Sequence, residues 1–303
     1  MPKCSKKKTN RRYIPYCKKI LNRNALDNPD IIQSIIDKAE IKSTDIVLEL
    51  DPCGGNLTVK LLESASKVIA YEVDPKLFAE LRKRVTGTPM EEKLQLSNCN
   101  VVQSDLPFFD LCIGNVPFQI DYKILVKLIL HRPVFRCAIL LFHKEFADKL
   151  VAKPGDANYS RLSASIQLYA SVQMLMNVEK NNFKPPAKDD SCVLKIEPKN
   201  PPPDFKYEEW DGLTRTLFHR KEKKLSVLFK EAKVLTEMNN TYTKHCRTNN
   251  IPIPDNFNIN EKVDQILTSN EISEMCPRTM DTDDFIKVYT ALKNEGIFFY
   301  WHI

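Results

Sequence analysis

The residues best suited to chemistry form a turn at positions 114–118, Gly-Asn-Val-Pro-Phe, directly after an apolar stretch. The exocyclic amine of adenine is a poor nucleophile because its lone pair is delocalised into the ring, so a site that methylates it must orient it with hydrogen-bond acceptors. The Asn115 side-chain oxygen and the Val116 backbone carbonyl supply two. Pro117 restricts the turn, and Phe118 offers a face for an extruded base. We predict Asn115, Pro117 and Phe118 as catalytic; a purely structural turn is the alternative.

Two weaker signals lie upstream. Residues 51–55 form a turn with two adjacent glycines between a predicted strand and a predicted helix, which brings backbone N–H groups close to a ligand. Glu72 ends the next predicted strand, where a carboxylate can accept hydrogen bonds from both hydroxyls of a ribose. Each has an ordinary alternative, because paired glycines are common in turns without ligands and an acid at this position also suits helix capping or the surface.

Short apolar stretches alternate with helical patterns through the first half of the chain. Predicted strands cover residues 45–50, 67–72, 94–96, 111–114 and 134–142, and predicted helices cover 29–39, 56–63, 75–85 and a segment after 121. This alternation predicts an α/β fold of βαβ units, whose crossovers require a mostly parallel, Rossmann-like sheet with helices on both faces. Ligands of such sheets bind beyond the carboxyl ends of the strands.

The proline-rich segment at residues 199–204 marks the clearest boundary, because consecutive prolines continue neither a helix nor a central strand. Beyond it a largely helical pattern runs to about residue 284. We therefore predict a basic, flexible tail at residues 1–20, an α/β domain at 21–200 and a smaller, mainly helical domain at 201–303.

Composition limits the classes of protein. With 43% hydrophobic and 28% charged residues, the chain has the balance of a globular protein. No apolar stretch approaches the roughly 20 residues of a membrane-spanning helix, and no apolar stretch follows the basic N-terminus as in a secretory signal. The nine cysteines form no C-x-x-C pair, so we expect free thiols and no metal site.

Positive charge is concentrated in two places. Residues 3–23 contain nine Lys or Arg residues and no acid, and residues 215–230 contain six against the single acid Glu222. Together the clusters predict a polyanionic partner. Taken singly, each is also typical of a solvated tail or an exposed helix face.

From Leu21 to Phe298 the chain resembles the eukaryotic small-subunit ribosomal RNA adenine dimethyltransferases. Asn-x-Pro-Tyr/Phe is the catalytic signature of amino-methylating methyltransferases, and further matching stretches occur in the family's order at residues 56–62, 104–110, 130–133, 151–156, 181–186, 196–203, 209–213 and 280–285. The resemblance implies a class I methyltransferase sheet, a C-terminal helical domain that contacts RNA, and S-adenosylmethionine as cofactor. It also implies dimethylation of two adjacent adenosines near the 3′ end of small-subunit ribosomal RNA.

Carried over position by position, the resemblance implies a cofactor site made of Asn24, Leu26, Asp51, Gly55, Glu72, Asn100 and Asn115. The family's loop pattern Glu-x-Gly-x-Gly-x-Gly has lost two of its three glycines here, to Asp51 and Cys53. If Cys53 has a left-handed backbone, its Cβ costs roughly 1–2 kcal/mol. Asn100 stands where the family has an aspartate that contacts the cofactor's adenine, and Asn24 lies in a motif without its glycine and glutamine.

These departures leave the activity open between two main hypotheses. The first is a working dimethyltransferase, favoured by the retained catalytic turn. The second is a catalytically weak or silent ribosome-assembly factor that keeps its RNA-binding surface; a general nucleic-acid-binding protein is a third reading, which the long family match disfavours. In either main case we expect small-subunit ribosomal RNA in a pre-ribosomal particle as partner, no membrane or metal, a monomer, and a location in the nucleus and nucleolus.

Overall fold

The computed structural model describes residues 24–117 and 119–299. The predicted tail at 1–20 and Phe118 therefore lie outside the described residues. A seven-stranded sheet has the order β4-β3-β2-β5-β6-β9-β7. Its strands are β2 (Ile46–Leu50), β3 (Lys67–Tyr71), β4 (Leu94–Ser97), β5 (Leu111–Asn115), β6 (Cys137–His143), β7 (Ala170–Val178) and β9 (Ser191–Pro198).

The first five strands in that order are parallel to their neighbours, and β9 runs antiparallel to both β6 and β7. Parallel strands buried on both faces are apolar almost throughout, as the residues of β2 and β6 are. The predicted α/β fold with a mostly parallel sheet is confirmed.

Helices cover both faces of the sheet. One apolar core joins Val47 and Val68 to α1 (Pro29–Ala39), α2 (Asn56–Ser64) and α3 (Pro75–Val85). The opposite core joins Leu48 and Leu140 to α4 (Asp121–Ile129), α5 (Lys144–Val151) and α6 (Arg161–Tyr169). Since successive residues of a strand point to opposite faces, alternate residues of β2 enter the two cores.

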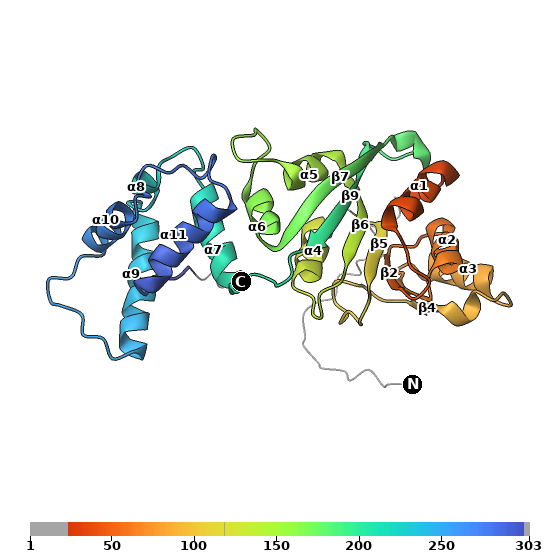
Figure 1. The fold of residues 1–303 in the computed structure, drawn as a ribbon, viewed down its shortest axis with the longest axis horizontal. Coiled ribbons are helices and arrows are strands. Elements are labelled where there is room, and N and C mark those ends of the chain that lie inside the picture. The colour runs from red at the N-terminus through yellow and green to blue at the C-terminus, as the bar shows by residue number, and fades with distance from the viewer. Residues whose placement is uncertain (1–23, 118, 300–303) are drawn as a thin grey trace.

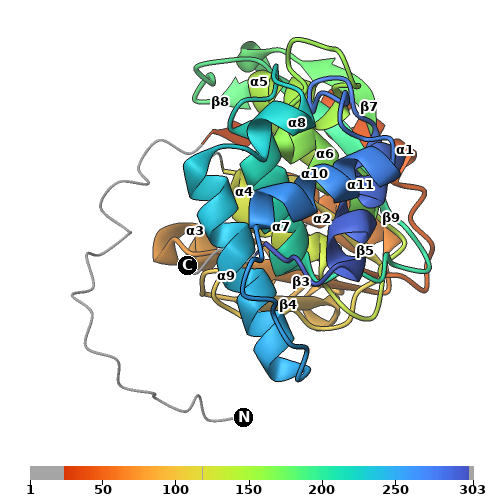
Figure 2. The same cartoon turned by 90° about the vertical axis from the view of Figure 1, so that its left-hand side faces the viewer.

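The C-terminal helices gather at one end of the molecule, opposite α1, α2 and α3 (Figure 1). They are α7 (Tyr207–Phe218), α8 (Leu225–Leu228), α9 (Ala232–Thr248), α10 (Ile259–Ser269) and α11 (Thr282–Asn294). Viewed from that end, they lie in front of the sheet (Figure 2). Buried Trp210 contacts Phe285 and Tyr289 at ring-centroid distances of 6.3 Å, and all three belong to the same apolar core as Leu48.

Two predicted boundaries were wrong. The helical region does not end near residue 284: Asp281 and Asp284 form the capping box that begins α11, which continues to Asn294. The strand predicted from residue 134 begins at Cys137, because Arg136 instead donates its backbone N–H to the Asp110 carbonyl and pairs its side chain with Asp45.

A short pairing that the sequence did not predict lies outside the main sheet. β1 (Ala25–Leu26) pairs antiparallel with β8 (Phe183–Lys184), which joins segments far apart in the chain. Within the described ranges, no helix is both long and apolar enough to cross a membrane.

Candidate active site

Gly114 sets the position of the predicted catalytic turn. A Cβ on this residue would lie 2.3 Å from the Leu50 carbonyl oxygen, a distance that real Cβ atoms do not reach. Glycine therefore allows the end of β5 to approach the end of β2 closely. As a result Asn115, the last residue of β5, lies beside the loop at residues 51–55.

Asn115 is connected to two distant segments. Its Nδ2 donates to the Asn24 carbonyl at 3.1 Å, and Asn24 Nδ2 donates to the carbonyls of Pro185 and Pro186 at 2.8 and 3.1 Å. The β1–β8 pairing holds these segments in register. Because the amide nitrogen of Asn115 is engaged by a carbonyl, Oδ1 is the atom with which this side chain can accept a hydrogen bond from a ligand.

Two cavities open at the carboxyl ends of the strands. One of about 450 Å³ is lined by residues that include Leu26, Glu49, Asp51, Cys53 and Asn115. Another of about 370 Å³ is lined by residues that include Asp51, Tyr71, Asn100, Val116 and Pro117. Asp51 lines both, so it lies between the two cavities.

Two residues other than glycine in the loop between β2 and α2 have the left-handed backbone that glycine favours. Asp51 has a φ of 54° and Cys53 a φ of 50°, both in the left-handed region, as has Gly55 at 84°. Cys53 therefore has a left-handed backbone, and its Cβ costs roughly 1–2 kcal/mol. Gly55 has a second constraint, because a Cβ there would lie 2.4 Å from Leu81 Cδ1.

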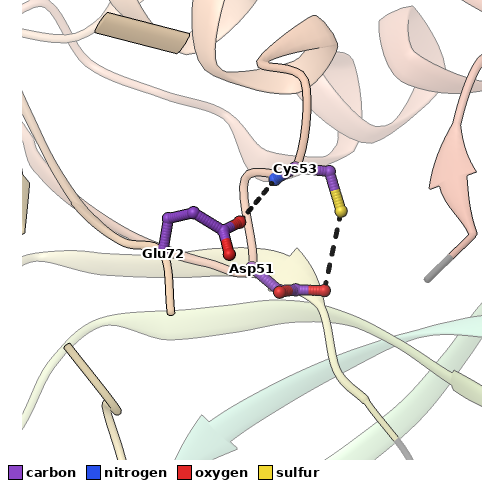
Figure 3. A group of neighbouring side chains, drawn as sticks. All are labelled: Asp51, Cys53 and Glu72. Carbon is purple, nitrogen blue, oxygen red and sulfur yellow. Dashed lines mark hydrogen bonds between the residues drawn. The ribbon is translucent and has the colours of Figure 1, made fainter. Parts of the chain in front are cut away.

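Glu72 holds this loop in place. Its fully buried carboxylate accepts the Cys53 backbone N–H through Oε2 at 3.2 Å and the Asp74 backbone N–H through Oε1 at 2.7 Å. The Cys53 thiol in turn donates to Asp51 Oδ2 at 3.7 Å (Figure 3). Glu72 is not among the residues that line either cavity. The contacts of its carboxylate show an anchor for the loop, and its role toward a ribose stays a prediction.

The same three side chains form a mixed carboxylate and thiol cluster. One potential ligand atom from each of Asp51, Cys53 and Glu72 lies within 4.8 Å of the others (Figure 3). The expectation of no metal site rested on the spacing of the cysteines. This cluster has no such spacing, because Glu72 comes from a different strand, so a search for paired cysteines could not find it.

Glu49 matches the first position of the family's loop pattern but was not predicted as a site residue. Its side chain is fully buried, lines the larger cavity, and makes no hydrogen bond of normal geometry within the described residues. Burial raises the pKa of Glu49 to about 8; the nearby Thr58 hydroxyl lowers it, and the charges of Asp51 and Glu72 raise it further. The available signal was an acid flanked by Leu48 and Leu50 in an apolar strand.

Of the remaining predicted site residues, some line a cavity and others do not. Asn100 lines the smaller cavity, and its Oδ1 accepts the Val102 backbone N–H at 3.0 Å. Pro117 lines the same cavity, whereas Gly55 and Asn24 are not among the lining residues of either cavity. Leu26 is buried against the larger cavity.

Acids neutralise much of the basic cluster at residues 215–230. Ion pairs join Arg215 to Asp211, Arg220 to Glu231, Lys224 to Glu274 and Lys230 to Asp264. Exposed Lys223 makes no ion pair within the described ranges. The acidic partners at positions 264 and 274 lie outside residues 215–230. A count of charges within that range alone therefore overstates the positive charge that is not paired with an acid.

Comparison with known proteins agrees with this geometry. Residues 16–272 match the family model described as ribosomal RNA adenine dimethylase. A probable dimethyladenosine transferase of Drosophila melanogaster is 47% identical, over 99% of this chain and 100% of the relative. The dimethyladenosine transferase of Saccharomyces cerevisiae is 41% identical, over 92% of this chain and 89% of the relative. This chain belongs to the ribosomal RNA adenine dimethylase family.

Solved structures support the same assignment. A dimethyladenosine transferase from Plasmodium falciparum is 38% identical and superposes with a TM-score of 0.86, covering 91% of this dimethylase-family chain and 100% of that one. The 23S rRNA methyltransferase ErmE, at 21% identity and a TM-score of 0.62, shares the fold. The predicted class I methyltransferase sheet and family membership are confirmed.

Proposed function

We propose that this protein uses S-adenosylmethionine to dimethylate the N6 amines of two adjacent adenosines near the 3′ end of small-subunit ribosomal RNA, as part of ribosome biogenesis. The observation that carries the proposal is the position of Asn115, which lines one cavity together with the loop that the family uses for its cofactor. Membership of the dimethylase family and the names of the relatives support the substrate class.

The residues at the cavities fit this cofactor. S-adenosylmethionine supplies an electrophilic methyl group on a positively charged sulfur, and it also carries an ammonium group. Buried Glu49, without a hydrogen bond of normal geometry, and the Asp51 carboxylate offer oxygen acceptors in the larger cavity. We propose that Leu26, Asp51 and Asn115 contact the methionine part, that Gly55 shapes the loop, and that Asn100 and Glu72 serve the adenosine part.

The catalytic turn would orient the target amine. In this proposal Asn115 Oδ1 and the Val116 carbonyl accept hydrogen bonds from the adenine amine as positive charge develops on its nitrogen. Pro117 restricts the turn, and a target base stacks on Phe118. Asn24 is a positioning residue, because its carbonyl accepts from Asn115 Nδ2 and so determines which side of the amide carries the oxygen.

RNA would reach this turn across two surfaces. The segment at residues 183–186 lies beside Asn24 and thus close to Asn115, and we propose that it contacts the target strand. Helices of the proposed domain at residues 201–303 would contact RNA farther from the reacting base. The protein would act as a monomer on a pre-ribosomal particle, in the nucleus and nucleolus.

Transfer of labelled methyl groups to a 3′-terminal small-subunit RNA fragment tests the proposal. We expect Asn115→Ala to lower the transfer rate at least about 100-fold, because an acceptor for the developing charge is lost, while RNA affinity stays within about twofold. Asn294→Ala, at the exposed end of α11, is the matched control. Full activity of Asn115→Ala would disprove the assignment of the turn.

A silent assembly factor is the second candidate, and the backbone at Asp51 and Cys53 favours it. Both residues have positive φ on the loop that would hold the cofactor. Calorimetric titration with S-adenosylmethionine separates the candidates when the natural chain is compared with an Asp51→Gly/Cys53→Gly double variant. Micromolar binding by the natural chain supports the enzyme. Binding only by the double variant supports an assembly factor with a degraded cofactor loop.

A further inference from the structure

Asp51 occupies a particular place in the candidate active site. It lines both cavities, whereas Glu49 and Asn115 line only the larger one and Asn100 only the smaller. In S-adenosylmethionine the sulfur atom joins the methionine part to the adenosine part. If the two parts occupy the two cavities, the sulfur lies between them beside Asp51, a carboxylate where the family pattern has glycine.

We propose that Asp51 makes the site selective for the positively charged sulfonium of the cofactor over the neutral thioether of the product, S-adenosylhomocysteine. The inference rests on the proposed function, since it assumes that this cofactor binds here. Opposite charges attract more strongly in a partly enclosed site than in water, and the product has no charge on its sulfur to be attracted. Selectivity of this kind would reduce inhibition by product.

Contacts around Asp51 support a defined orientation of its carboxylate. The Cys53 thiol donates to Asp51 Oδ2, and Pro52 restricts the backbone between the two residues (Figure 3). The Cys53 backbone N–H is itself held by buried Glu72. Burial raises the pKa of the other acid of the larger cavity, Glu49, to about 8, which favours the protonated, neutral form of Glu49 near neutral pH.

A divalent metal ion is the competing occupant of this cluster. Both oxygens of Glu72 already accept backbone N–H groups, from Cys53 and from Asp74, and the Cys53 thiol donates to Asp51. A metal bound by all three residues requires a deprotonated thiol and the rearrangement of these hydrogen bonds. A cationic sulfur beside Asp51 requires neither, which favours the organic cation.

Calorimetry with three probes tests the inference on the whole protein. The probes are S-adenosylmethionine, S-adenosylhomocysteine and sinefungin, an analogue with a protonated amine in place of the methylated sulfur. We expect the natural chain to bind both cations at least about tenfold more tightly than the thioether. Asp51→Asn keeps the size of the side chain and removes its charge, so it should weaken both cations about tenfold and leave the thioether within about twofold.

Asp27→Asn is the matched control. Asp27 is exposed and accepts a hydrogen bond from Asn56, whose side chain contributes to the larger cavity. The same loss of charge there should leave the ratio of affinities for cation and thioether unchanged. If Asp51→Asn weakens all three probes equally, or none of them, the inference is wrong.

Two further outcomes would also decide whether the inference about Asp51 is correct. Zinc that binds the natural chain at a one-to-one ratio, is lost in Asp51→Asn and blocks S-adenosylmethionine would overturn the inference in favour of a metal site. Failure of all three probes to bind the natural chain would refute the proposed function and the inference with it. An unchanged ratio with intact binding refutes the inference alone.

Discussion

The two sides of the candidate active site have diverged from the family pattern to different extents. On the target side, Asn115 and Pro117 match the Asn-x-Pro signature on which the resemblance rests, and Asn115 bonds to Asn24, which also contacts residues 185–186. On the cofactor side, Asp51 and Cys53 stand where the resemblance implies glycines, and both have a left-handed backbone. The difference shows that tertiary contacts, above all the hydrogen bond from the Cys53 N–H to Glu72, impose the shape of the cofactor loop against local preference.

The target side should be the less tolerant of added atoms. In Gly114→Ala the new Cβ would meet the Leu50 backbone, so we expect the free energy of unfolding to fall by about 3 kcal/mol or more in urea denaturation. Gly54→Ala, on the cofactor side, is the matched control, because a Cβ there meets only Glu80 Oε1 at 3.9 Å. Equal destabilisation of the two variants would contradict the contrast between the two sides.

On the cofactor side, buried Glu49 should make stability depend on pH. Because its pKa is raised from 4.5 to about 8 on folding, the folded chain retains a proton that the unfolded chain releases across this interval. Stability of the natural chain therefore falls as pH rises from about 4.5 to 8.

Glu49→Gln removes this dependence. We compare the free energy of unfolding of Glu49→Gln with that of the natural chain by urea denaturation at each pH. The difference in favour of the variant should increase by on the order of 2 to 3 kcal/mol from pH 5 to pH 8. Glu92→Gln, at an exposed position, is the control. Parallel stability profiles for Glu49→Gln and the natural chain would show that the buried acid is not the cause.

Backbone strain at Cys53 predicts a smaller effect, in which glycine at this position stabilises the protein relative to alanine. Cys53→Gly should be more stable than Cys53→Ala by about 1 kcal/mol, because both lose the sulfur but only glycine relieves the positive φ. At Cys112, in the middle of β5, the order should invert, since glycine weakens a strand relative to alanine by roughly 0.5–1 kcal/mol. The same order at both positions would rule out backbone strain as the explanation.

The smallest expected effect concerns RNA binding by the C-terminal region. Lys223 and Lys224 are adjacent and exposed, but only Lys224 is paired, with Glu274. Lys223→Ala should lower the slope of log affinity against log salt by about one, and Lys224→Ala by less, because a neutralised charge releases fewer counterions. Equal slopes for the two variants would show that the ion pair does not persist in the complex.

Prediction from the sequence succeeded for the elements and only partly for the site. The bounds predicted for α3, residues 75–85, are those observed, because Pro75 at the first turn and a regular apolar spacing are local signals. The placement of Glu72 beneath the loop was not predictable, because it depends on how β3 lies against β2. The same holds for the ion pairs of Lys224 with Glu274 and of Lys230 with Asp264.

By itself, the sequence determined the alternation of strands and helices, the turn at residues 114–118, and the loss of two loop glycines. These are patterns of neighbouring residues, and short-range sterics and apolar periodicity suffice to specify them. Only the tertiary structure decided that Asn24 contacts both Asn115 and residues 185–186, that Glu49 is buried at a cavity, and that Asp51 lines two cavities. Such tertiary contacts depend on strand order and register, which bring together side chains separated by tens of residues in the sequence.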